Sequence, residues 1–248
     1  DGVPIGGVSL EEAGRLIRGP VGRKVDLIFQ RPGQNFLKRV IITRSQIEVP
    51  NVESRMMEDQ IGLIRIASFS RTSGEEFAAA YAQLLDQGMK GLVLDLRGNG
   101  GGYLASAVEV AQWLVPSGPV VWLKTVNGLT PIETIPHEQP IRVAVLIDRG
   151  TASAAEIVAG AVQDSGVGIL IGTQSYGKGS VQTLYQVDDG SVIKLTTAHY
   201  LTPKQRSLDG VGLTPDLLID LPGIPVNDAS DLQLQAAIKW LKQHGVSR

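Results

Sequence analysis

Three short apolar runs restrict the possible folds of this chain more than any other feature. They lie at residues 91–96, 142–147 and 167–171 and consist almost entirely of Leu, Val, Ile and Ala. Such nearly continuous runs are typical of strands buried on both faces of a sheet. Helical patterns follow the first two runs, so we expect residues 46–248 to form one layered α/β (α+β) core.

Other patterns from residue 46 onward complete this core. Residues 180–187 and 191–200 alternate in polarity around the turn Asp188-Asp189-Gly190, which predicts a hairpin. The remaining predicted elements are a strand at 62–69 and helices from about 73 to Gly88, at about 103–114, at about 152–163 and at 231–244.

Residues 1–45 have the pattern of a small separate module. Ser9 is placed to N-cap a helix that ends near Ile17, and two strands are expected at 24–31 and 36–43. A helix and one hairpin are too little to close a domain, and the chain begins at Asp1 rather than at Met. We therefore expect the beginning of this module to lie outside the chain.

Composition excludes several classes of function. The chain has 248 residues, 43% of them apolar, with a net charge of −2 and no run of Lys or Arg, so a folded protein without a nucleic-acid surface is expected. No apolar stretch approaches the roughly 18 residues of a membrane span, and no leader precedes Asp1. The absence of Cys excludes disulfides, Cys-ligated zinc and a cysteine nucleophile.

Three glycine-rich near-motifs fit nucleotide-binding or penicillin-binding patterns poorly. The segment from Gly172 to Lys178 resembles a phosphate-binding loop, but Gly179 stands where Ser or Thr is needed and a strand pattern follows instead of a helix. Ser175 and Lys178 match a Ser-x-x-Lys pattern without its companion motifs. The turn at 98–102 lacks the third glycine of a dinucleotide fingerprint.

Two strand-to-helix corners could take part in catalysis. The glycine turn at 98–102 exposes backbone N–H groups that can face negative charge, although it can equally be a plain tight turn. Ser153 begins the next helix, where the N–H of Ala154 could donate to an oxyanion. The alternative interpretation is that Ser153 only caps its helix.

A nucleophilic serine needs a base, and no histidine of the chain is suitably placed. His137 lies in a proline-flanked loop, His199 in a strand and His244 in the tail. A lysine removed from water and from acidic neighbours can accept a proton instead. Lys178 meets this condition in the sequence, because no Asp or Glu occurs from Gly166 to Val187.

Several separated segments resemble the carboxyl-terminal processing proteases, a family of Ser/Lys endopeptidases that carry a PDZ domain. The segments span most of residues 60–220 in the family's order. They are Leu94-Asp-Leu-Arg97-Gly-Asn-Gly-Gly-Gly102, Gly150-Thr-Ala-Ser153-Ala-Ala-Glu156-Ile, Gly172-Thr-Gln-Ser-Tyr-Gly177-Lys178-Gly-Ser-Val-Gln182, Thr196-Thr-Ala-His-Tyr-Leu-Thr-Pro203 and Gly212-Leu-Thr-Pro-Asp216.

The resemblance implies a role for each matching residue. Ser153 would be the nucleophile, Lys178 the general base, and Gln182 the residue that orients Lys178. Gly100 replaces a proline that is often found in the family's turn. The oxyanion hole would use the backbone N–H of Ala154 and that of one turn glycine, Gly101 in first place and Gly100 or Gly102 otherwise.

The resemblance also implies a fold and a substrate site. The core would be ClpP/crotonase-like, and residues 1–45 would be the later half of a PDZ domain. Its helix would bind substrate through Ala13, Leu16 and Ile17. The family's carboxylate-binding loop would precede the chain.

The expected function is therefore that of a serine endopeptidase that cleaves proteins near their C-terminus. The expected partners are protein or peptide substrates, without nucleic acid, metal or organic cofactor, and the expected location is extracytoplasmic, in a bacterial envelope or thylakoid lumen. The alternatives are a resting or non-catalytic module that binds protein termini and, less favoured, a nucleotide binder. The sequence leaves the oligomeric state open.

Overall fold

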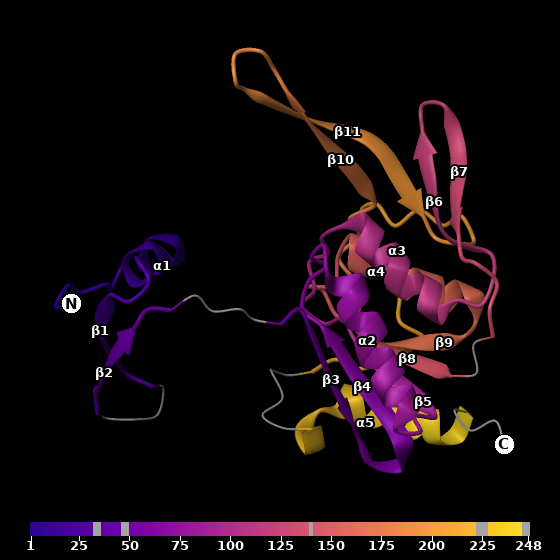
Figure 1. Cartoon of the computed structure of the whole chain (residues 1–248), viewed down its shortest axis with the longest axis horizontal. Coiled ribbons are helices and arrows are strands. Elements are labelled where there is room, and N and C mark those ends of the chain that lie inside the picture. The colour runs from indigo at the N-terminus through magenta and orange to yellow at the C-terminus, as the bar shows by residue number, and fades with distance from the viewer. Residues whose placement is uncertain (32–35, 46–49, 139–140, 222–227, 245–248) are drawn as a thin grey trace. The chain divides into compact units, whose positions relative to one another are not determined.

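The structure is a computed structural model that describes all residues except 32–35, 46–49, 139–140, 222–227 and 245–248. The chain divides into two compact units, Asp1–Pro50 and Asn51–Arg248 (Figure 1). We describe each unit by itself. The predicted boundary at residue 45 lies just before residues 46–49, which the structure does not describe.

The first unit contains one helix and one hairpin. Helix α1 covers Leu10–Ile17, and the Ser9 side chain accepts a hydrogen bond from the Glu12 N–H at 3.2 Å, as the sequence predicts. Strands β1 (Lys24–Phe29) and β2 (Lys38–Thr43) pair antiparallel. Among the described residues of this unit, Val25 is the only buried apolar residue. The described residues of this unit therefore provide little hydrophobic stabilisation.

The described part of the second unit is built on a six-stranded sheet in the order β12-β9-β8-β5-β4-β3. All neighbours pair parallel except β3, which pairs antiparallel with β4 at one edge. The predicted apolar runs are β5, β8 and β9, which confirms the α/β (α+β) class. The strands are β3 (Val52–Met56), β4 (Ile61–Ile66), β5 (Gly91–Asp95), β8 (Arg142–Ile147), β9 (Gly168–Gly172) and β12 (Leu217–Leu218).

Helices cover both faces of this sheet. Along β5, Leu92 and Leu94 point into the core that α2, α3 and α4 share, whereas Val93 packs on the other face with Leu234 and Leu241 of α5. Alternate residues of a strand face opposite sides of the sheet. A strand covered on both faces therefore needs a run of apolar residues rather than an alternating pattern. The helices are α2 (Ser73–Asp86), α3 (Leu104–Leu114), α4 (Ala154–Ser165) and α5 (Leu232–His244), with short 3₁₀ turns at Glu58–Gln60 and Asp228–Ser230.

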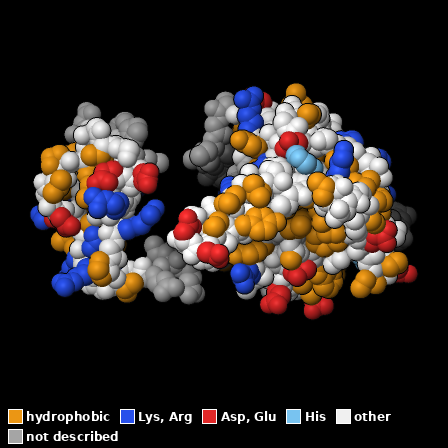
Figure 2. Space-filling view, turned by 90° about the horizontal axis from the view of Figure 1, so that it is seen from above, with side chains coloured by type: hydrophobic (Ala, Val, Ile, Leu, Met, Phe, Trp, Pro, Cys, Tyr) orange, Lys and Arg blue, Asp and Glu red, His pale blue; other side chains and the backbone are white. Residues whose placement is uncertain are grey.

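A second sheet, ordered β10-β11-β6-β7, extends from one end of the core. Its two hairpins project beyond the helices (Figure 1), and apolar side chains gather on the side toward which they point (Figure 2). Exposed apolar residues of the β10–β11 hairpin include Leu184, Ile193 and Leu195. The strands are β6 (Pro119–Thr125), β7 (Gly128–Glu133), β10 (Ser180–Gln186) and β11 (Val192–Leu201).

Candidate active site

Ser153 lies at the corner between β8 and α4, at the N-cap position of the helix. Its backbone has φ 58° and ψ −119°, a combination that non-glycine residues rarely adopt. Strained conformations of this kind persist where the surrounding contacts fix them, and they concentrate at functional sites. The N–H of Ala154, the next residue, donates to no acceptor among the described residues. The corner therefore presents a hydroxyl beside a free N–H.

The glycine turn after β5 packs directly against this corner. Gly101 has φ +98°, and a Cβ there would lie 2.8 Å from both the Ala152 carbonyl oxygen and the Ser153 Cβ. A side chain at position 101 is therefore excluded by conformation and by space together. The positive φ and close approach give this glycine a specific structural role beside Ser153.

Asn99 fixes the path of the turn. It is fully buried, its Nδ2 donates to the Ile66 carbonyl at 2.8 Å, and its Oδ1 accepts from the Gly101 N–H at 2.9 Å. The Asn99 carbonyl also accepts from Ala152 at 2.9 Å. The N–H of Gly101, predicted as an oxyanion donor, is thus engaged in this structure. Those of Gly100 and Gly102 have no acceptor within the part of the chain that is described.

Asp148 and Thr151 attach the same turn to β8. The Asp148 Oδ1 accepts from the backbone of Gly98 at 2.9 Å and of Gly150 at 2.9 Å. The buried Thr151 hydroxyl donates to the Leu96 carbonyl at 2.8 Å. The turn after β5 and the corner after β8 are therefore one hydrogen-bonded assembly at the carboxyl ends of neighbouring parallel strands.

Glu156 joins the Ser153 corner to the segment that carries Lys178. Its side chain is fully buried, yet both carboxylate oxygens have donors. Oε2 accepts from the N–H of Ser153 at 2.8 Å and of Lys178 at 2.9 Å, so the two backbone nitrogens share one acceptor atom. Oε1 accepts from the Ser175 hydroxyl at 2.5 Å and the Gly177 N–H at 2.8 Å. Four donors compensate the burial of this charge.

The side chains of Lys178 and Gln182 are both exposed. The backbone around Lys178 is held by Glu156 and, through the Gly179 N–H, by Asp209 at 3.1 Å. Within the described residues, however, the Lys178 ammonium makes no hydrogen bond to Ser153. Gln182 lies on β10 directly after a shift in its pairing register with β11. The structure thus brings the Lys178 backbone to the corner and leaves its side chain in solvent.

The hydroxyl that meets Ser153 in this structure belongs to Tyr200 of β11. The Tyr200 phenol donates to the Ser153 Oγ at 2.8 Å and is only 4% exposed. Burial, aided by the carboxylates of Glu156 and Asp209, raises the pKa of Tyr200 to about 12, although the hydrogen bond to Ser153 acts in the opposite direction. The phenol is therefore neutral and able to donate at neutral pH.

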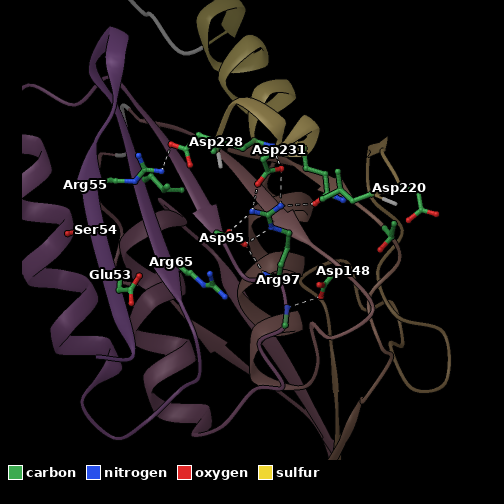
Figure 3. A pocket seen from close by; sticks show the side chains of 16 residues that line it. Glu53, Ser54, Arg55, Arg65, Asp95, Arg97, Asp148, Asp220, Asp228 and Asp231 are labelled. Atoms are coloured by element: carbon green, nitrogen blue, oxygen red, sulfur yellow. Dashed lines mark hydrogen bonds and ion pairs between the residues drawn. The ribbon is translucent and has the colours of Figure 1, made fainter. Parts of the chain in front are cut away.

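A separate pocket of about 740 Å³ lies on the side of the sheet covered by α5. Figure 3 shows Arg97 at its centre, where the guanidinium contacts Asp95 at 2.7 Å and Asp231 at 2.8 Å. Burial acts to lower the pKa of Arg97, but hydrogen bonds and the charges of both carboxylates outweigh it and raise that pKa. These contacts tie the start of α5 to the end of β5. Neither Ser153 nor Lys178 lines this pocket.

The predicted substrate-binding residues lie on α1 of the first unit. Ala13 is half-buried, and Leu16 and Ile17 are each 39% exposed. Exposed apolar side chains on a helix are available for contact with a peptide, but nothing in this unit tests that role. The assignment of these residues remains a prediction.

Sequence reasoning assigned no role to Asn99, Glu156 or Tyr200. Glu156 had a local signal, since it stands three residues after Ser153 in the spacing of a capping box. Asn99 stood between glycines in the predicted turn. Tyr200 had no local signal, because its partner lies 47 residues away in the sequence.

Comparison with known proteins shows the family of the chain. Residues 60–219 match the sequence profile of peptidase family S41. This chain belongs to peptidase family S41. The matched range contains Ser153, Lys178, Gln182 and Tyr200, so the candidate site lies wholly inside it.

Two curated relatives show how the similarity extends beyond that range. The chain is 34% identical over 252 residues to a carboxyl-terminal-processing protease of Synechocystis, covering 97% of this chain and 58% of the relative. It is 37% identical over 225 residues to the carboxy-terminal processing protease CtpA of Bacillus subtilis, covering 90% of this chain and 48% of that protein. The chain thus spans about half the length of these relatives.

Solved structures resemble the chain in fold as well. The photosystem II D1 C-terminal processing protease superposes with a TM-score of 0.68 at 30% identity, covering 93% of this chain and 64% of that one. An S41 protease from Bacteroides fragilis gives a TM-score of 0.67 at 19% identity over 88% of this chain and 65% of that one, a likeness of fold alone.

Among the described helices none is long and apolar enough to cross a membrane.

Proposed function

We propose that this S41 chain is a serine endopeptidase in which Ser153 is the nucleophile and Lys178 the general base. The observation that carries the proposal is the shared acceptor: one oxygen of the buried Glu156 holds the backbone N–H groups of both residues. Folding therefore places the two candidate residues on adjoining segments, although 25 positions separate them. The free N–H of Ala154 beside the strained Ser153 corner gives further support.

Acylation would proceed by addition to the peptide carbonyl. The Lys178 amine takes the Ser153 hydroxyl proton while Oγ bonds to the carbonyl carbon, and the π electron pair moves onto the carbonyl oxygen. The tetrahedral intermediate then collapses. Its C–N bond breaks, the leaving amine takes the proton from the Lys178 ammonium, and an acyl-enzyme remains on Ser153.

Hydrolysis would release the second product by the same steps with water. Lys178 takes a proton from the water as its oxygen bonds to the acyl carbon, and collapse breaks the bond to Oγ. The Lys178 ammonium then returns the proton to Ser153 Oγ. The released product is a carboxylic acid, which ionises in solution. The amine and the hydroxyl end the cycle in their initial states.

The negative oxygen of each intermediate would be held by backbone donors. We assign one to the N–H of Ala154, which has no other acceptor among the described residues. The second would come from the glycine turn, where a Cβ on Gly101 would lie 3.0 Å from the Ala154 nitrogen. Since Asn99 occupies the Gly101 N–H, the neighbouring N–H groups of Gly100 and Gly102 are the turn's open donors. Fixed donors of this kind stabilise the oxyanion without reorganisation.

The proposal requires the Lys178 side chain to turn from solvent toward Ser153. The N–H groups of Lys178 and Gly179 are already held by Glu156 and Asp209, so we propose that rotation about side-chain bonds, without refolding of the segment, brings the amine inward. Gln182, on the strand that follows, would orient the amine. Covering of the site by substrate would remove Lys178 from water, which favours its neutral form.

The substrates we propose are proteins or peptides cut near their C-terminus, as the names of the processing-protease relatives state for those proteins. A C-terminal segment of the substrate would be held by the partial PDZ unit through Ala13, Leu16 and Ile17. One relative is a chloroplastic processing peptidase of Tetradesmus obliquus, 32% identical over 92% of this chain. An extracytoplasmic location is proposed on the same basis.

The test is digestion of an unstructured protein such as casein, with fragments identified by mass spectrometry. The chain should produce fragments, and Ser153→Ala should produce none while circular dichroism shows that it is still folded. Equal cleavage by Ser153→Ala would contradict the proposal. Binding of a peptide C-terminus without cleavage by the unaltered chain would favour a binding module instead.

A further inference from the structure

The contact between Tyr200 and Ser153 has no part in the mechanism given above. The Tyr200 phenol is the hydroxyl that reaches the Ser153 Oγ, at 2.8 Å, and it is almost completely buried. A buried polar side chain is normally placed by a hydrogen bond, since burial without one is costly. Here that bond is made to the atom that would attack the substrate.

The direction of the bond determines what it can do. A serine hydroxyl has one proton to donate and two lone pairs that accept. Tyr200 donates into one lone pair, so the Ser153 proton stays available for a base. A donor on Oγ also becomes stronger when Oγ gains negative charge, because hydrogen bonds to ionised acceptors are roughly twice as strong as neutral ones.

Tyr200 also contacts the segment of the base. Its backbone N–H donates to the carbonyl of Gly179, the residue after Lys178, at 2.9 Å. In the β10–β11 ladder the neighbouring His199 is paired with Ser180. One residue thus contacts the nucleophile with its side chain and the Lys178 segment with its backbone.

We propose that Tyr200 is a further functional residue of this site, which holds the Ser153 Oγ in its attacking orientation and stabilises the charge that develops on it. This inference rests on the proposed function. Burial supports it, since a phenol with a raised pKa stays protonated at neutral pH. The same bond would act again in deacylation, when Oγ is the leaving atom.

The first test compares Tyr200→Phe with Tyr185→Phe in the full chain. Tyr200→Phe removes only the hydroxyl and should lower kcat by roughly 10- to 100-fold with KM unchanged, the loss expected for a bond to a charged acceptor. Tyr185 is 48% exposed on β10, so its variant should keep the original kcat. Unchanged kcat in Tyr200→Phe, with Ser153→Ala inactive, overturns this inference and leaves the proposed function standing.

The second test needs no catalysis. The chain has five tyrosines, and labelling each with ¹³C at Cζ gives a resolved signal that reports hydrogen bonding of the phenol. Ser153→Ala should shift the Tyr200 signal and leave that of Tyr185 in place. An unmoved Tyr200 signal overturns the inference even if the chain cleaves nothing. If Tyr200→Phe does not fold, Phe variants of the four other tyrosines identify the Tyr200 signal by elimination.

Discussion

Ser153 and Lys178 share an acceptor through their backbones, yet their side chains lie in contrasting environments. Around Ser153, buried or partly buried hydrogen bonds from Asn99, Glu156 and Tyr200 fix the glycine turn, the backbone of Ser153 and its hydroxyl. The Lys178 side chain is exposed and stands two residues before β10, whose hairpin with β11 projects from the core (Figure 1). The half that we propose to supply the nucleophile (the nucleophile half) is therefore preorganised by folding alone, whereas the half that we propose to supply the base is preorganised only in its backbone.

The largest effect should come from removing the Lys178 side chain. Lys178→Ala is expected to reduce peptide cleavage by at least about 10³-fold, since loss of the base removes the proton acceptor of both steps. Stability should not change, because the side chain is exposed and its backbone N–H remains on Glu156. Cleavage kinetics and thermal unfolding measure the two effects. Lys194→Ala, exposed on β11, is the control, and equal loss in both variants would contradict a specific role.

Glu156→Gln should damage both halves at once. An amide keeps the volume but replaces one acceptor oxygen by a donor, which leaves N–H groups of the Ser153 or Lys178 segment buried without a partner. The free energy of unfolding should fall by roughly 2–4 kcal/mol. Denaturant unfolding measures this change, and Glu75→Gln, at an exposed position of α2, should leave stability unaltered. A fully stable Glu156→Gln would show that the shared acceptor is dispensable.

Gly101→Ala tests the nucleophile half alone. Its positive φ and the 2.8 Å approach to Ala152 and Ser153 leave no room for a methyl group, so we expect a loss of roughly 1–3 kcal/mol in unfolding free energy. Gly100→Ala is a matched control in the same turn, since a Cβ there meets nothing within 4 Å. Equal stability of the two variants would mean that the turn can move away from Ser153.

The pH dependence of the free energy of unfolding tests the contribution of the Tyr200 hydroxyl. Its pKa of about 12 in the folded chain lies above the value near 10 of an unfolded tyrosine. The resulting stabilisation is complete below pH 10 and is lost as the pH rises through about 12, an effect of roughly 2–3 kcal/mol. The free energy of unfolding, measured with denaturant from pH 9 to 12, should therefore fall less steeply for Tyr200→Phe than for the unaltered chain. Parallel curves would contradict the raised pKa.

The sequence predicted the parts of the fold that depend on local patterns. The run at 142–147 is β8 at the predicted bounds, and both strands of the β10–β11 hairpin formed. The β6–β7 hairpin was not predicted, although the pair Asn127-Gly128 is a hairpin signal. Pro131 weakens the strand pattern there, and β7 tolerates it at the edge of its sheet.

Contacts between distant segments could not be predicted in the same way. The glycine turn and Ser153 were identified from their positions at strand ends, but the donors and acceptors that hold them come from elsewhere. Asn99 reaches Ile66, 33 residues earlier, and Glu156 reaches Lys178, 22 residues later. No periodicity of a single chain encodes such pairs. The exposure of Lys178 likewise follows from the path of β10 rather than from its glycine neighbours.

The distance in sequence between Ser153 and Tyr200 has a consequence for synthesis. A chain emerging from the ribosome presents Ser153, the proposed nucleophile, 47 residues before the phenol of Tyr200 and 25 residues before Lys178. Until β11 has folded back against the core, Ser153 lacks its partner and the hairpin beside Lys178 is unformed. The site can therefore assemble only after strands β4, β5, β8 and β9 and helices α2, α3 and α4 have been synthesised.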